Sequence, residues 1–140
     1  MNEANEAKLC QEFPRLYRQY GSDPKQSCMA FGFEVDDGWF DLIYELSKKL
    51  EAAYQKLPPE ERAKWDEVRG GVAEQVKEKW GGLRFYISGG NDEMYQAITE
   101  AEEKSFTTCE ACGKPGKSGR SVGNWWIKTL CDECRSKNTK

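Results

Sequence analysis

The sequence contains no histidine and no long hydrophobic run. The missing histidine removes the commonest general base of enzymes and excludes every mixed Cys/His metal shell. No apolar stretch approaches the ~20 residues that cross a bilayer, and residues 1–6 are polar and acidic, unlike a signal or transit peptide. We therefore expect a cytoplasmic protein that is not an enzyme, with no membrane partner and no small-molecule substrate.

Length and composition indicate one globular domain with a modest core. The chain has 140 residues, of which 38% are hydrophobic and 32% charged, enough to bury about two-thirds of the unfolded surface. The net charge is −3, but residues 1–103 carry 13 Lys/Arg and 21 Asp/Glu, whereas residues 104–140 carry 8 and 3. This predicts an acidic body and a basic C-terminal segment, which face different partners or attract each other.

Four of the six cysteines form two Cys-x-x-Cys pairs near the C-terminal end. The pairs are Cys109/Cys112 and Cys131/Cys134, with eighteen residues between them. This spacing is typical of one tetrahedral zinc ion held by four thiolates, and Gly113 suits the positive φ of the first knuckle. A disulfide framework is the alternative. Because four protein thiolates leave no open coordination position, we expect the zinc to be structural.

Hydrophobic periodicity predicts four helices. They cover residues 4–20 (with an interruption at Pro14), 39–57, 60–68 and 92–106, with Asp37 and Asn91 as the expected N-caps of the second and last. The residues predicted to face the core are Leu9, Phe13, Leu16 and Tyr20 in the first helix, and Met94, Tyr95, Ile98, Ala101 and Ser105 in the last.

Glycine pairs at 70–71 and 89–90 bracket the clearest β-hairpin, and residues 30–35 are expected to be extended. The hairpin alternation predicts Gly81-Gly82 as a two-residue turn, with Trp80 paired to Leu83. One face then carries Val76, Trp80, Leu83, Phe85 and Ile87, with Glu78 as the odd polar member. The opposite face carries Gln75, Lys77, Lys79, Arg84, Tyr86 and Ser88.

These elements predict an α+β fold in which helices pack on a short antiparallel hairpin or sheet. Residues 1–106 would form the body, and residues 107–140 a four-cysteine zinc module packed on it, with residues 124–130 in a strand pair. A helical turn starting at Cys131 would make the module a truncated treble clef, and a second knuckle would make it a zinc ribbon. The sequence leaves both open.

Several of these motifs together resemble a known family. They are Gly38-Trp39 at the start of a helix, the Val-Lys-Glu-Lys-aromatic-Gly-x-Leu-Arg-Phe-Tyr hairpin at 76–86, the Ala-Glu-x-x-Ser helix end at 101–105, and the cysteine segments 109–116 and 129–134. The pattern spans residues 30–134 and is similar to a widespread set of small proteins from bacteriophages and bacterial genomes that have no agreed activity. The resemblance implies a phage- or prophage-type accessory protein inside a bacterial cell.

Three surfaces are candidates for partner binding. The first is the solvent face of the hairpin, with Lys77, Lys79, Arg84 and Tyr86, although such charges also serve merely to keep hairpins soluble. The second is the basic zinc end, with Lys114, Lys117, Arg120, Lys128, Arg135, Lys137 and Lys140. The third is an acidic, aromatic stretch in which one of the adjacent rings Trp39 and Phe40 should be exposed, and which suits a basic protein partner. Its residues are Phe31, Phe33, Glu34, Asp36, Asp37, Trp39, Phe40 and Asp41. Of the neighbouring Trp125 and Trp126, one should belong to the core of the zinc module, and Trp126 is a candidate for contact with a partner.

Two functions follow from these surfaces. The first hypothesis is a non-enzymatic zinc protein that binds and modulates or inhibits a host, defence or regulatory protein. The alternative is a regulatory zinc protein that binds nucleic acid through Lys77, Lys79, Arg84 and the basic tail. Redox chemistry at a free Cys-x-x-Cys pair is a third reading, which a tightly held zinc ion would exclude.

Overall fold

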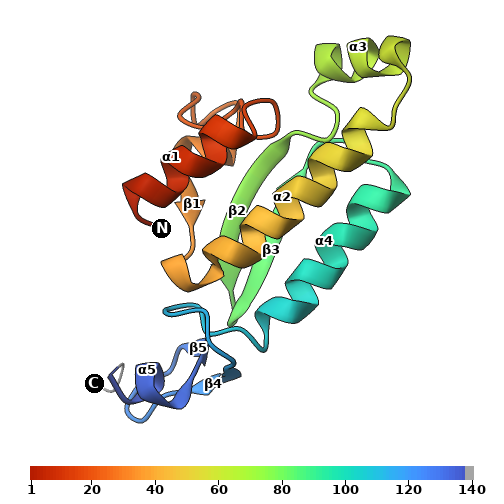
Figure 1. The fold of residues 1–140 in the computed structure, drawn as a ribbon. Helices are drawn as coiled ribbons and strands as arrows, with labels where there is room; N and C mark the ends of the chain where they lie inside the picture. Colours follow the sequence, from red (N-terminus) through yellow and green to blue (C-terminus); the bar gives the residue numbers. More distant parts are fainter. Residues whose placement is uncertain (138–140) are drawn as a thin grey trace.

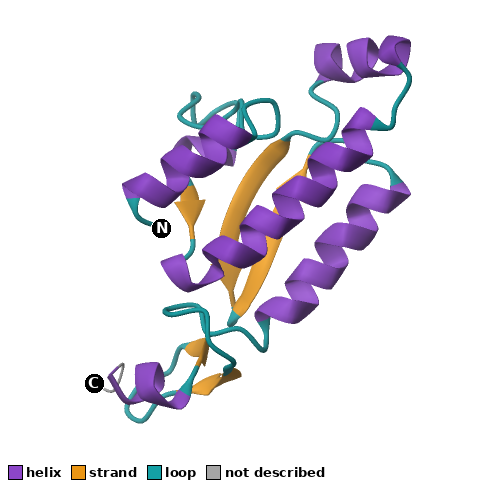
Figure 2. Cartoon of the chain, viewed as in Figure 1, coloured by secondary structure: helices purple, strands orange, loops and turns teal. Residues whose placement is uncertain are grey.

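The α+β class predicted from the sequence is confirmed by the computed structural model, which describes residues 1–137. Figure 1 follows the chain through its elements, and Figure 2 separates helices from strands. The helices are α1 (Glu3–Glu12), α2 (Phe40–Gln55), α3 (Pro59–Val68), α4 (Asp92–Ser105) and α5 (Asp132–Lys137). The strands are β1 (Phe33–Glu34), β2 (Ala73–Lys79), β3 (Gly82–Ile87), β4 (Lys117–Arg120) and β5 (Ile127–Leu130). None of the helices within residues 1–137 is long and apolar enough to cross a membrane.

The main sheet has three strands in the order β1-β2-β3. Strand β1 comes from the segment expected to be extended and runs parallel to β2, with Phe33 opposite Val76, whereas β3 is antiparallel to β2. Helices α2 and α4 lie side by side across one face of this sheet (Figure 1). Side chains of β3 alternate between buried and more exposed from Leu83 to Tyr86, as half-buried strands do, whereas the register of β2 is interrupted between Ala73 and Gln75.

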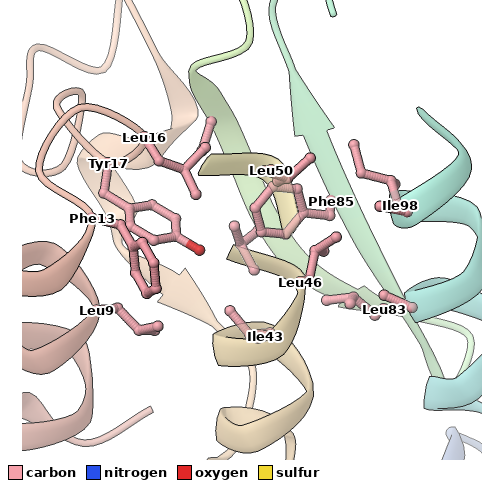
Figure 3. Packing of buried hydrophobic residues seen from close by; sticks show 14 of the residues in the cluster. Leu9, Phe13, Leu16, Tyr17, Ile43, Leu46, Leu50, Leu83, Phe85 and Ile98 are labelled. Atoms are coloured by element: carbon pink, nitrogen blue, oxygen red, sulfur yellow. The ribbon is translucent and has the colours of Figure 1, made fainter. Parts of the chain in front are cut away.

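Aliphatic side chains and aromatic rings from the N-terminal segment, α2 and β3 meet aliphatic side chains of α4 in one core (Figure 3). Leu9, Phe13 and Leu16 are buried as predicted, but α1 ends at Glu12, just before Pro14, because proline cannot continue a helix from its interior. The turns that follow place Tyr17 in the core and leave Tyr20 42% exposed, so the prediction for Tyr20 was wrong. In α4, Tyr95 is also exposed, while Ala97 is buried.

The start of α2 differs from the sequence prediction. Asp37 does not cap α2, whose first residue follows a short 3-10 turn (Asp37–Trp39). Instead the Asp37 carboxylate accepts hydrogen bonds from the backbone N–H of Asn2 and the side-chain amide of Asn5, which fixes α1 to this turn. At α4 the predicted N-cap is confirmed, since Asn91 accepts from the N–H of Met94.

The hairpin turn lies one residue earlier than predicted. Lys79 pairs with Gly82 and Glu78 with Leu83, so the two turn residues are Trp80 and Gly81, with φ of 55° and 83°. Positive φ at both positions is typical of a type I′ turn, whose backbone twist suits a two-residue hairpin. The predicted faces are otherwise kept. Trp80, however, leaves the apolar face and is 61% exposed at the turn.

Candidate metal centre and its contacts with the body

The four cysteine sulfurs lie within 4.8 Å of one another. The Sγ atoms of Cys112 and Cys131 are 3.7 Å apart, far longer than the ~2.05 Å of a disulfide bond. A tetrahedron with metal–sulfur bonds of about 2.3 Å has sulfur–sulfur edges of about 3.8 Å. The observed separation matches that edge, so the donor set fits one tetrahedral metal ion.

Local structure explains how each pair reaches the site. Cys109 and Cys112 lie on a tight turn after α4, and Gly113 has the predicted positive φ of 84°. Cys131 precedes α5 and Cys134 lies in its first turn, with the N–H of Cys134 donating to Cys131 Sγ at 3.4 Å. Strands β4 and β5 form an antiparallel pair between the two cysteine pairs. A helix at the second pair is the treble-clef arrangement, one of the two that the sequence left open.

The thiol pKa values show why this cluster favours a cation. Burial raises the pKa of Cys109, but backbone N–H groups of Cys131, Cys112 and Ala111 outweigh burial and lower it to about 7. The hydrogen bond to Cys131, together with burial and the other sulfurs, raises the pKa of Cys134 to about 12. Four thiolates at this separation repel one another, which opposes the deprotonation of all four thiols. A divalent cation between them offsets this repulsion.

A buried carboxylate, Glu110, lies between the first two cysteines. Its side chain is 2% exposed, and it accepts from the backbone N–H of Asp36 at 3.0 Å and from Lys128 Nζ at 3.5 Å. Its backbone O accepts from the N–H of Gly38 at 2.7 Å, and its N–H donates to Thr129 O at 2.9 Å. Burial raises the pKa of Glu110, which Lys128 and the N–H of Asp36 oppose. Every polar group of this residue therefore has a partner, as a buried charge requires.

Lys128 joins the module to the hairpin. Its ammonium lies 3.3 Å from Glu78 Oε1 and 3.5 Å from Glu110 Oε1, while Glu78 Oε2 accepts from the N–H of Gly81 at 2.7 Å. Glu78 was the odd polar member of the predicted apolar face. In the structure it pairs with Lys128 of the C-terminal segment and holds the N–H of Gly81 in the hairpin turn. The sequence analysis missed Glu110 and this role of Lys128. A lone acid on an apolar strand face was the signal that a cation had to lie nearby.

Further contacts join residues 107–137, here called the four-cysteine module, to the body. Trp39 Nε1 donates to Thr108 O at 2.8 Å, and Thr129 Oγ1 donates to Gly81 O at 2.6 Å. Backbones also approach closely: a Cβ at Gly38 would lie 2.3 Å from Glu110 O. In Figure 1 the module lies at the end of the molecule where the hairpin turns and α2 begins.

Several cations of the basic C-terminal segment are held within the molecule. Arg135 donates to the carbonyls of Gly119, Lys117 and Lys128, which braces the β4-β5 pair. The other engaged cations are Arg120, with Trp125 O and its ring, Lys128, with the two glutamates, and Lys137, with Glu133. Lys140 lies outside the described residues. Ion pairing therefore removes Lys128 and Lys137 from the predicted basic surface, whereas Arg120 and Arg135 are held in place by carbonyls.

The candidate partner residues divide into two groups. Lys77, Arg84, Lys79 and Tyr86 share the sheet face away from α2 and α4, with Lys77 opposite Arg84 in register, and form what we call the outer hairpin face. Trp39, in contrast, is fully buried and cannot contact a partner, because its ring fills the junction between the body and the module. Phe40 beside it is half-buried.

The tryptophans of the module also depart from the prediction. Trp125 is 84% and Trp126 71% exposed, so neither is a core residue of the module. The module is small, and its interior is taken by cysteine sulfur, Leu130 and Thr129. Trp126 and Trp80 together line a groove with Lys77 and Lys79 at the junction of hairpin and module.

Comparison of the chain with protein-family models, with curated proteins and with solved structures gave no match.

Proposed function

We propose that the chain is a non-enzymatic binding protein, closed by a structural zinc ion on Cys109, Cys112, Cys131 and Cys134, that docks on a host or regulatory protein. Four thiolates give zinc a complete shell, with no position for substrate or water. The sequence offers no histidine as general base. Zinc is the metal that such an all-sulfur tetrahedral set most often holds in structural sites.

The observation that carries this proposal is the group of exposed tryptophans at the module end. Trp80, Trp125 and Trp126 are each more than half exposed, although tryptophan is usually largely buried. Exposed tryptophan rings are also the commonest strong anchors of protein interfaces. An exposed aromatic group on a metal-closed scaffold supports a docking role.

The resemblance to phage and prophage proteins supplies the biological setting of the proposal. In that setting the protein acts in the bacterial cytoplasm as an accessory factor that modulates or inhibits a host or defence protein. Such a role needs a rigid surface and no turnover, which is what a module held to the core by Glu110, Lys128 and Trp39 provides.

A pull-down from bacterial lysate with mass spectrometry tests the proposal. The zinc-loaded chain is the bait, with and without nuclease, beside Trp126→Ala and a matched control, Tyr95→Ala, whose exposed ring lies on α4. We expect the chain to capture a lysate protein whether or not nuclease is added. Tyr95→Ala should capture the same protein, and Trp126→Ala should not. Recovery of no specific protein, or formation of a reaction product by the purified chain, would refute the proposal.

Nucleic-acid binding is the second candidate, favoured by the outer hairpin face. Lys77 and Arg84 are opposite each other, with Lys79 and Tyr86 nearby, an arrangement suited to phosphate contact and base stacking. Fluorescence anisotropy with single- and double-stranded 20-mers at low salt tests it. Binding that weakens steeply with salt, and that Lys77→Glu abolishes, would support this candidate. The absence of any shift at low salt would remove it.

A further inference from the structure

A groove of about 220 Å³ lies where the hairpin meets the four-cysteine module. Its lining residues are Lys77, Glu78, Lys79, Trp80, Trp126 and Ile127. Two of them, Trp80 and Trp126, are large exposed rings that come from segments more than forty residues apart. The groove therefore exists only because the module packs against the hairpin turn.

The backbone at Trp80 is in a conformation that is unfavourable for so bulky a side chain. Its φ of 55° lies in the left-handed region, where a bulky residue is a rare outlier. Asparagine or glycine is the usual residue at this position of a type I′ turn. Strain of this kind concentrates at functional sites, because elsewhere a better-suited residue replaces it.

The charge of the groove is positive. Within residues 1–137, the ammonium groups of Lys77 and Lys79 form no ion pair or hydrogen bond with another residue, which leaves both cations available. The single acid of the lining, Glu78, is already bound by Lys128 and the N–H of Gly81. The open groups at the groove are thus two indole rings and two cations.

We infer that this groove binds an acidic peptide segment of the partner protein, with an apolar or aromatic side chain of the peptide between Trp80 and Trp126 and its carboxylates on Lys77 and Lys79. The inference rests on the proposed function and names the chemistry of the partner. A hollow of this size holds one or two side chains, as the central pocket of a peptide interface does. Complementary charge then sets the register and speeds the encounter.

A peptide fits this surface better than single-stranded nucleic acid does. Nucleic-acid grooves need a continuous basic track along several nucleotides. Of the cations beyond the groove, Lys128 is engaged with two glutamates and Arg135 with three carbonyls, and Arg84 adds a single cation on the same sheet face as Lys77. Residues 1–103, with 13 Lys/Arg and 21 Asp/Glu, also repel a long polyanion more than a short acidic segment.

Strand addition to the three-stranded sheet is hindered, because contacts within the molecule occupy part of each of its edges. On β3, the outward N–H groups of Leu83 and Phe85 donate to Ser105 Oγ and Glu102 Oε2 of α4. On β1, the N-terminal ammonium donates to the carbonyls of Phe33 and Val35. A partner strand would have to displace these contacts to extend the three-stranded sheet, which favours recognition by side chains in the aromatic groove.

Selection from a displayed library of random 12-residue peptides tests the inference. The zinc-loaded protein is the target, and Trp80→Asn/Trp126→Ala serves for counter-selection. We expect the enriched peptides to be rich in Asp and Glu and to carry an aromatic or large apolar residue. Trp126→Ala should weaken a selected peptide about tenfold or more, whereas Trp125→Ala, whose exposed ring lies outside the groove, should change affinity less than about twofold.

Two further measurements use the same peptides. In ¹H–¹⁵N spectra, the indole resonances of Trp80 and Trp126 should shift on binding, and that of buried Trp39 should not. The double variant Lys77→Glu/Lys79→Glu should no longer bind the selected acidic peptides. Trp80→Asn should also raise the denaturation midpoint, since it removes the left-handed strain, so lost binding in this variant does not reflect unfolding.

The results also separate this inference from the proposed function. Enrichment of basic or uncharged peptides, or no enrichment over the double variant, overturns the peptide inference. At 150 mM salt, the affinity of a twelve-nucleotide oligothymidine is compared with that of the selected peptides. If the protein binds the oligothymidine more tightly than every peptide, the groove is assigned to nucleic acid instead. If a lysate protein is captured equally by wild type and by Trp80→Asn/Trp126→Ala, the docking function stands and the groove is not its site.

Discussion

The buried carboxylate of Glu110 accepts a hydrogen bond from the backbone N–H of Asp36, with 3.0 Å between N and Oε2. This bond joins a residue between two metal ligands to the turn that begins α2, 74 residues away in the sequence. Gly38 and Trp39, in the same turn, donate to Glu110 O and Thr108 O. The metal site and the hydrophobic core therefore meet at one junction, and a disturbance of either should reach the other.

Metal removal should destabilise the body as well as the module. We expect one zinc ion per chain by elemental analysis, and a lower thermal midpoint with a smaller near-ultraviolet dichroism signal from Trp39 after chelation. The reason is that metal binding supplies much of the folding free energy of so small a unit. Cys131→Ser should reproduce the effect. A chain that holds no metal, or that keeps its midpoint after chelation, would contradict this prediction.

Lys128→Met should lower the free energy of unfolding by about 2 kcal/mol. Breaking a fully buried pair costs about 3–5 kcal/mol, and the 31% exposure of Lys128 reduces that loss through solvent screening. The loss arises because Glu110, 2% exposed, keeps its charge without its cation. Urea denaturation gives the measurement.

Two companion variants distinguish this network from ordinary ion pairs. Glu110→Gln combined with Lys128→Met should cost less than the sum of the single changes, because the double variant buries no unpaired charge. Lys137→Met, which breaks an exposed pair with Glu133, should change stability by less than about 0.5 kcal/mol. Equal effects of Lys128→Met and Lys137→Met would show that burial of the network does not matter.

Gly38→Ala should lower stability by about 3 kcal/mol, since overpacking costs about 1–3 kcal/mol and the obstacle here is backbone. The new Cβ would lie 2.3 Å from Glu110 O and 2.4 Å from Cys109 O. Gly119→Ala in β4 is the matched control, because a Cβ there meets nothing within 4 Å. The comparison of their denaturation midpoints is decisive, and equal midpoints would mean that the module does not sit tightly on the turn.

Asp37→Ala should remove a stabilisation that depends on pH. The hydrogen bond from the N–H of Asn2, with help from the amide of Asn5, lowers the pKa of Asp37 below its ordinary value. A lowered native pKa stabilises the fold above the unfolded pKa of about 3.9, and that stabilisation disappears as pH falls through the native pKa. Urea midpoints of wild type and variant should therefore differ at pH 7 and converge near pH 2. A difference between the two midpoints that stays the same at every pH would mean that the negative charge of Asp37 does not cause the stabilisation.

Much of the fold follows from local pattern in the sequence. The stripe in α2, the Asn91 cap of α4 and the alternation in β2 and β3 reflect contacts between near neighbours, so their residues predict them. The Cys-x-x-Cys spacing likewise predicted a four-sulfur cluster, because each pair sits on one tight turn. These features need little information from distant parts of the chain.

The errors occurred where long-range packing competes with local preference. Gly81-Gly82 looked like the turn, but Gly82 pairs with Lys79 and lies against Phe106, where a Cβ would come 2.3 Å from the ring, and this pairing leaves Trp80 in the turn. Tyr17 displaced Tyr20 from the core because α1 stops before Pro14. Trp39 was a candidate contact from its sequence neighbours alone, and only its position against Thr108 shows it to be buried.

By itself, the sequence determined the fold class, most of the helical segments and the four cysteines that cluster, since spacing and periodicity are properties of neighbouring residues. Only the tertiary structure decided where the module sits, which charges are buried and which tryptophans remain exposed. Those outcomes depend on residues such as Glu78, Glu110 and Lys128, which meet only after the chain has folded and whose attraction at that distance leaves no pattern along the sequence.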